Sequence, residues 1–130
     1  MAEDGLQTIV TAMRIHVMVP DVIGWACGAL TGLSAHSIIL VSILESGAVP
    51  EILKGMHAHP TSSVAQEYGC DCLLCLLDPH DAEDAVDKVV ADIIQHDGVA
   101  AFVAAMRAHP SVPEVQRHVC SAFYHLLVGL

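Results

Sequence analysis

The chain has very little positive charge, few aromatic residues and no asparagine. Its five Lys and Arg residues stand against 15 Asp and Glu, which gives a formal net charge of −10 at pH 7. Without a basic stripe, the chain cannot displace the counterions of a nucleic acid or bind an anionic membrane surface. We therefore expect no nucleic acid or membrane partner, and a basic or apolar protein surface is the better expectation.

Aromatic residues make up only 4% of the chain, although apolar residues reach 54% and the mean hydropathy is +0.56. A core with so few rings must consist of Ala, Val, Leu, Ile and Met side chains, which suits closely packed helices. A chain of 130 residues has room for one continuous core. We therefore expect a single domain over residues 1–130.

Recognisable catalytic motifs are also missing. The sequence has no P-loop, no Gly-x-Gly-x-x-Gly fingerprint, no His-Glu-x-x-His pair and no Gly-x-Ser-x-Gly elbow. His, Cys and Asp are plentiful, but abundance does not bring them together in space. These absences predict a protein that is not an enzyme and that needs no cofactor.

Three segments of the chain repeat one pattern without gaps. They begin at Gly5, Ala48 and Gly98, at spacings of 43 and 50 residues. Four positions are identical in all three: Met13, Met56 and Met106; His16, His59 and His109; Cys27, Cys70 and Cys120; Leu33, Leu76 and Leu126. Such self-similarity indicates a stack of similar units, each of which buries an apolar face on the next.

Each segment contains two stretches with helical periodicity. In the first, apolar residues recur at offsets of three, four and seven, as in residues 6–13. This stretch ends at the repeated His, and Pro60 and Pro110 stop it in two of the three segments. The second stretch begins near Pro20, Ser62 and Pro113 and continues through the repeated Cys.

A third element precedes the second and third segments. Alone, residues 38–44 would pass for a buried strand, but the matching residues 82–95 show a helical period. The first segment lacks this element. We expect about eight helices in three units: unit 1 at about residues 1–34, unit 2 at about 35–77 and unit 3 at about 78–130.

Several short motifs resemble the armadillo repeat. They are Gly-Ala-Val-Pro-Glu-Ile-Leu from Gly47, Gly-Val-Ala-Ala-Phe-Val from Gly98 and Ala-Leu-Thr-Gly-Leu-Ser from Ala29. The resemblance covers nearly the whole chain, and the sequence is similar to a divergent branch of the armadillo superfamily. It implies a short right-handed α-solenoid whose first repeat lacks its first helix. It also implies a non-enzymatic scaffold that holds a protein or peptide partner along a groove formed by the third helices.

The resemblance also implies where a partner would bind. Armadillo proteins that read extended peptides use an Asn near the end of the third helix, often preceded by Trp. The matching positions here are Thr31, Gly32, Leu74, Cys75, Tyr124 and His125. These six residues are the expected partner-binding residues. Because none of them is Asn, capture of a peptide backbone by an Asn clamp is not expected.

Gly24, Gly28 and Gly32 stand at offsets of four on one helix face. Each exposed glycine inside a helix costs about 1 kcal/mol relative to Ala, so three in register call for a compensating contact. Close approach of another helix, within the chain or in a second molecule, would supply one. We therefore predict self-association through these residues. A self-assembling repeat unit, or a fragment of a longer array, is the alternative to a scaffold.

The same glycines lie in an uncharged stretch, residues 22–44, which is long enough to cross a bilayer. In units 2 and 3 the positions equivalent to these three glycines are mostly polar. We therefore interpret this stretch as a soluble helix with a glycine face. The start of the chain, Met-Ala-Glu-Asp, has no signal peptide, and we expect a cytoplasmic protein.

The five cysteines and nearby histidines form a third candidate feature. Cys70, Cys72 and Cys75 do not share one helix face, and Cys70 belongs to the repeated position that we expect to be buried with Cys27 and Cys120. No metal is therefore predicted, and a His/Cys metal-binding protein is the least favoured alternative. The repeated His is expected to be structural, facing orphan carbonyls at a helix end.

Overall fold

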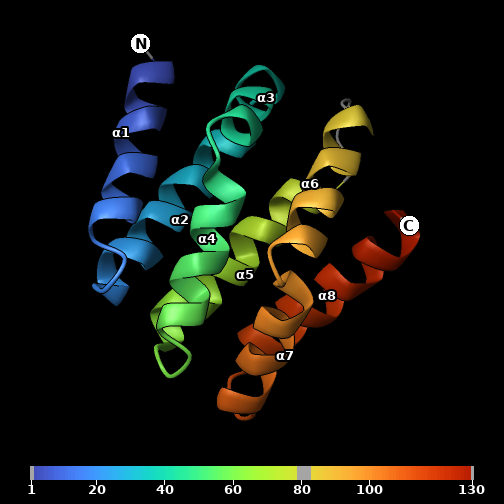
Figure 1. Cartoon of the computed structure of the whole chain (residues 1–130). Coiled ribbons are helices and arrows are strands. Elements are labelled where there is room, and N and C mark those ends of the chain that lie inside the picture. Colours follow the sequence, from blue (N-terminus) through green and yellow to red (C-terminus); the bar gives the residue numbers. More distant parts are fainter. Residues whose placement is uncertain (1, 79–82, 130) are drawn as a thin grey trace.

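A computed structural model describes residues 2–78 and 83–129 of the chain. Within these residues it has eight α-helices and no strand, as predicted (Figure 1). The helices are α1 (Ala2–Ile15), α2 (Pro20–Ser34), α3 (Ser37–Glu45), α4 (Ala48–Ala58), α5 (Ser63–Leu77), α6 (Glu83–Gln95), α7 (Gly98–Ala108) and α8 (Pro113–Gly129). The ambiguous apolar run after His36 is helix α3.

Local sequence explains most of the helix boundaries. A left-handed residue precedes both α4 and α7, namely Gly47 with φ 81° and Asp97 with φ 58°. Pro20 occupies the first turn of α2, where its missing N–H breaks no bond. The Ser62 side chain caps α5 by accepting a hydrogen bond from the backbone N of Ala65 at 3.2 Å.

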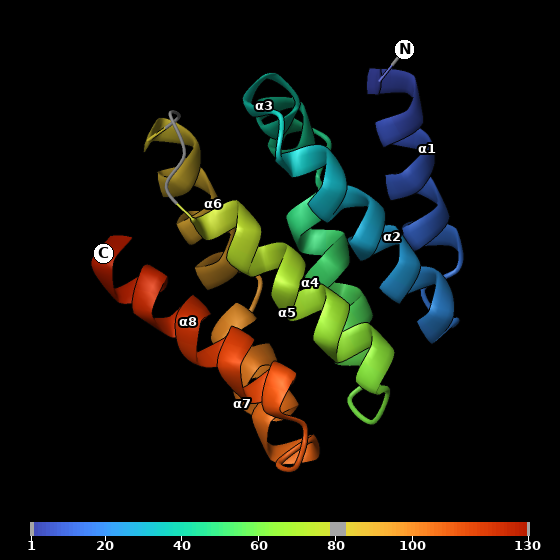
Figure 2. The same cartoon turned by 180° about the vertical axis from the view of Figure 1, so that it is seen from behind.

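The helices form two layers. One layer contains α2, α5 and α8 side by side, with α5 packed against both neighbours (Figure 2). The other contains α1, α4 and α7 in the same order (Figure 1). Helices α3 and α6 contact each other at one end of this second layer. Equivalent helices of the three units therefore lie next to one another.

One apolar core runs between the layers through all three units. It consists mainly of aliphatic side chains, as the composition predicted, and Phe102 is fully buried among them. Phe102 packs edge to face on Phe123, with ring centroids 5.7 Å apart. The core therefore holds each helix pair to the next pair.

The repeated histidine makes the same hydrogen bond at both junctions between units. Nε2 of His59 lies 2.6 Å from the carbonyl O of Val17, and Nε2 of His109 lies 2.9 Å from that of Pro60. A carbonyl only accepts, so Nε2 must be the protonated nitrogen in both rings. The expected structural role thus takes a different form. The accepting carbonyl belongs to the bend of the preceding unit, not to the helix that ends at the histidine.

Replacing His59 with Ala is expected to lower the free energy of unfolding by about 1–3 kcal/mol, because the Val17 carbonyl loses its donor in a half-buried place. Urea denaturation followed by circular dichroism measures the loss. His57→Ala is the matched control, since His57 is exposed near the end of the same helix. Equal losses in the two variants would contradict a role for the bond between units.

The uncharged stretch at residues 22–44 is divided between α2 and α3. Across the described parts of the chain, no single helix combines the length and apolar character needed to cross a membrane. One pair, Ala85–Gln95 with Gly98–Ala108, reaches that length and composition only when its two helices are taken together, and they meet at a bend of 72°.

Candidate functional site

The six predicted partner-binding residues occupy the later halves of three neighbouring helices. Thr31 and Gly32 lie in α2, Leu74 and Cys75 in α5, and Tyr124 and His125 in α8. Because α5 packs between α2 and α8, these residues belong to one layer of the molecule (Figure 2). Gly32 and Tyr124 are exposed, whereas the other four are half-buried.

Two of these residues line a hollow between α2 and α5. Its volume is about 150 Å³, and its walls are Thr31, Ser34, Ala35, Cys75 and Asp78. The structure therefore brings Thr31 and Cys75 together. Tyr124 and His125 form a separate pair in α8, with ring centroids 5.4 Å apart and an angle of 77° between the rings.

The Cys75 thiol in this hollow is held in its protonated form. It donates a weak hydrogen bond to Oδ1 of Asp71 at 4.0 Å. Burial raises the pKa of Cys75, and the negative charges of Asp71 and Asp78 raise it further. A nucleophilic cysteine needs the opposite environment, with nearby positive charge that lowers the pKa. The hollow therefore suits binding better than thiolate chemistry.

The glycine face of α2 lies against α5. A Cβ added at Gly24 would collide with Cγ1 of Val64 and would lie 3.3 Å from its carbonyl O. A Cβ at Gly28 would lie 3.7 Å from the Tyr68 ring. Packing within the chain therefore accounts for Gly24. Gly28 also faces α5, but a Cβ there would make only an ordinary contact; both were predicted to meet a second molecule. Gly32 has open space around it.

A row of ring side chains crosses this layer and was not predicted from the sequence. Trp25, Tyr68 and His118 hold the same repeat position in α2, α5 and α8. Trp25 is 68% exposed, and its ring centroid lies 5.8 Å from that of Tyr68. Nε2 of His118 lies 3.6 Å from Oδ1 of Asp71. The repeat register alone would have revealed this row, because all three units have a ring at this position.

Carboxylates accompany the rings. Glu67 and Asp71 of α5 are half-buried and flank Tyr68 in the sequence, and Asp78 is exposed at the end of the same helix. Aromatic faces and carboxylates both attract cations, through cation–π contact and ion pairing respectively. The layer of α2, α5 and α8 therefore offers a surface for Lys or Arg side chains with apolar neighbours.

The repeated cysteines are not all buried, which corrects one prediction. Cys27 and Cys70 are fully buried, whereas Cys120 is exposed. Cys27 lies near Cys70 and Cys72 of the following unit, so this position contacts the next unit of the stack. In the described chain no helix packs against the side of α8 that carries Cys120, so this cysteine is exposed.

Metal-ligating side chains do not gather in the described parts of the chain. In residues 2–78 and 83–129, no group of three or more His, Cys, Asp or Glu side chains is arranged to hold a metal ion. His57 is exposed on α4, whereas Cys70 and Cys72 are buried in α5.

The chain matches no protein-family model, no curated protein and no solved structure.

Proposed function

We propose that this chain is a non-enzymatic scaffold for protein interactions, built as a short right-handed armadillo-like α-solenoid of three units. The observation that carries the proposal is the exposed Trp25 ring beside the half-buried Tyr68 ring, on a layer of equivalent helices that also carries the carboxylates of α5; His118, the third ring of the row, is buried. The repeated bonds of His59 and His109 support regular stacking of the units. This surface supports the proposal more directly than the fold does, because one fold can serve many functions.

The partner that fits this surface is a protein segment with Lys or Arg side chains next to apolar ones. Cations can lie on the exposed Trp25 indole and pair with Glu67 or Asp78, while apolar side chains enter the hollow beside Thr31 and Cys75. The formal net charge of −10 also favours encounter with a basic partner. The free thiols of Cys27, Cys70, Cys72 and Cys120 support a reducing, cytoplasmic location.

A labelled peptide in which Arg and Leu alternate tests the proposal. Fluorescence anisotropy is expected to show saturable binding that disappears when every Arg is replaced by Glu. Glu67→Lys is expected to weaken binding about tenfold or more, because a positive charge then faces the Arg side chains.

Glu45→Lys is the matched control. Glu45 is exposed on α3, outside the layer of α2, α5 and α8, and its replacement changes the net charge by the same amount. We expect this variant to bind the peptide nearly as well as the parent. If both variants lose the same affinity, the interaction is unspecific attraction to a negative protein and the proposed surface is wrong.

A further inference from the structure

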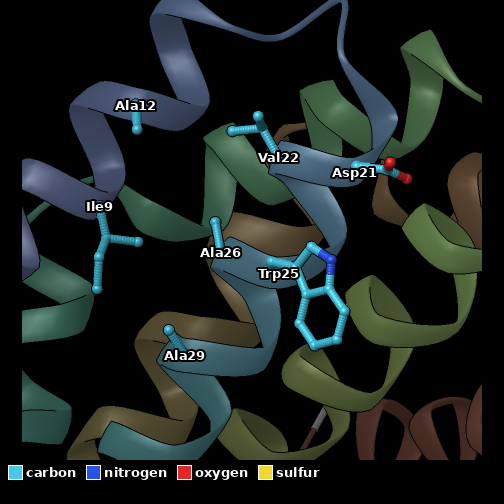
Figure 3. Close-up of a pocket in the computed structure, with 7 residues that line it drawn as sticks. All are labelled: Ile9, Ala12, Asp21, Val22, Trp25, Ala26 and Ala29. Atoms are coloured by element: carbon cyan, nitrogen blue, oxygen red, sulfur yellow. The ribbon is translucent and has the colours of Figure 1, made fainter.

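The first unit has an exposed apolar hollow at one end of the stack. Its volume is about 430 Å³, and it lies between α1 and α2, on the side away from α4 and α5 (Figure 3). Its apolar walls are Ile9, Ala12, Val22, Trp25, Ala26 and Ala29, and Asp21 stands at its edge. We call this surface the head face.

Most of the same repeat positions are buried in the other two units, under the unit that precedes them, whereas Tyr68, the equivalent of Trp25 in unit 2, is half-buried. In unit 2 they are Ile52, Gly55, Ala65, Gly69 and Cys72, and in unit 3 they are Phe102, Ala105, Val115, Val119 and Ala122. At Gly55 an added Cβ would lie 2.7 Å from Cγ2 of Ile23 in unit 1, which shows how tightly this junction is packed. The head face is therefore a junction surface without its covering unit.

The opposite end of the stack shows the complementary half of the junction. Val99 of α7 is 42% exposed and Leu127 of α8 is 72% exposed, and Cys120 is exposed between them in sequence. Their equivalents in unit 2 are Val49, Leu77 and Cys70, which are all buried. We call the exposed side of α7 and α8 the tail face.

Contacts at the two internal junctions predict which residues of the tail and head faces would pair. Gly28 lies against Tyr68 at the first junction, and Asp71 pairs with His118 at the second. On the tail face the residue equivalent to Gly28 and Asp71 is Ser121, and on the head face the residue equivalent to Tyr68 and His118 is Trp25. A small polar residue would thus lie against the exposed indole.

The same step predicts two more pairs. At the first junction Gly24 of unit 1 lies against Val64 of unit 2. The residue equivalent to Gly24 on the tail face is Arg117, and the residue equivalent to Val64 on the head face is Asp21. These two residues are exposed and of opposite charge. The bonds of His59 to Val17 and of His109 to Pro60 correspond to a bond from exposed His16 to the carbonyl O of Pro110. Shape, charge and hydrogen bonding therefore agree at this additional junction.

We propose that the tail face of one molecule binds the head face of a second copy of the same chain, in the register of the internal junctions. This interface joins two different surfaces, so it is heterologous and adds molecules one after another instead of closing a two-fold dimer. The inference goes beyond the proposed scaffold, because it uses the two ends of the stack. It covers Trp25, one ring of the proposed partner surface, but not the hollow between α2 and α5 beside Thr31 and Cys75.

Sedimentation velocity over a series of concentrations tests this, at roughly physiological salt, where a Debye length of about 8 Å screens the repulsion between acidic molecules. The expected result is a mass that keeps growing with concentration beyond a dimer. A monomer at every concentration, or a species that stops at a dimer, would overturn the proposal.

Charge reversal tests the register. Asp21→Arg and Arg117→Asp are each expected to weaken association about tenfold or more, because like charges then meet. The double variant restores both the pair and the net charge, so it is expected to associate like the parent chain. Failure of this rescue in a double variant with normal helix content would mean that Asp21 and Arg117 do not meet.

Blocking one face at a time tests the heterologous geometry. Ala29→Arg blocks the head face and Leu127→Asp blocks the tail face, so neither variant alone is expected to associate. Mixed in equal amounts, they are expected to form a dimer with one molecule of each, through the two intact faces. Ile38→Asp, at a residue 88% exposed on α3, is the control and should associate normally. Two face-blocked variants that stay monomeric when mixed would refute head-to-tail binding.

Discussion

The free energy of unfolding is expected to fall steeply as the pH rises above about 9. The cause is a set of buried thiols in α2 and α5. Burial raises the pKa of Cys70 and of Cys72 from 9.0 to about 12, and it raises the pKa of Cys27 as well. The protein should therefore unfold in alkali before these thiols ionise in the folded state.

The direction follows from proton binding. Between pH 9 and 12 the folded chain keeps these protons, while the unfolded chain releases them. The stabilisation that these buried, protonated thiols provide is complete below about pH 9 and is lost as the pH rises toward 12. Each thiol contributes a slope of about 1.4 kcal/mol per pH unit, so Cys70 and Cys72 together contribute about 3 kcal/mol per pH unit. Such a loss over two pH units is comparable with the whole stability of a typical domain.

Urea denaturation at several pH values between about 8 and 11 measures this slope. Cys72→Ala is expected to reduce the slope by one thiol's share, and Ala fits here because Ala29 and Ala122 hold the equivalent positions. Identical slopes in the parent and in Cys72→Ala would show that the buried thiol is not responsible.

Replacing Gly24 with Leu is expected to destabilise the protein by about 3 kcal/mol or more. A Leu side chain has no room there, because α2 lies directly against Val64 of α5, and overpacking must push the two helices apart. The urea midpoint, read from helical circular dichroism, measures the effect.

Gly32→Leu is the matched control on the same helix. Apart from its chain neighbours and the backbone of its own helix, no described atom lies within 4 Å of a Cβ at Gly32, so this replacement removes an exposed glycine from α2 without a clash. It is expected to raise stability by up to about 1 kcal/mol. If the two variants were equally stable, the close approach of α2 and α5 at Gly24 would be wrong.

The helices and their number could be predicted from the sequence because each signal is local. Helical periodicity, the proline stops and the matching of residues 38–44 with 82–95 depend only on neighbouring residues and on the repeat. Comparison between units even resolved the apolar run that alone resembled a strand, which is α3. The six expected partner-binding residues lie in one layer because they occupy the same two repeat positions in α2, α5 and α8.

Other features depended on which surfaces have a neighbour. Cys27, Cys70 and Cys120 share one position in the repeat, yet only Cys120 is exposed, because the described chain packs no helix against that side of α8. Likewise, the sequence marked Gly24 and Gly28 as a close-contact face but did not reveal that α5 fills it.

The sequence by itself thus determined the eight helices and the equivalence of positions between units, since both are encoded in local periodicity and in the repeat. Only the tertiary structure decided which equivalent positions are covered, which rings meet and which faces stay open at the two ends. The physical reason is that burial depends on the units packed on either side, and two identical local sequences differ in burial when one of them lies at the end of the stack.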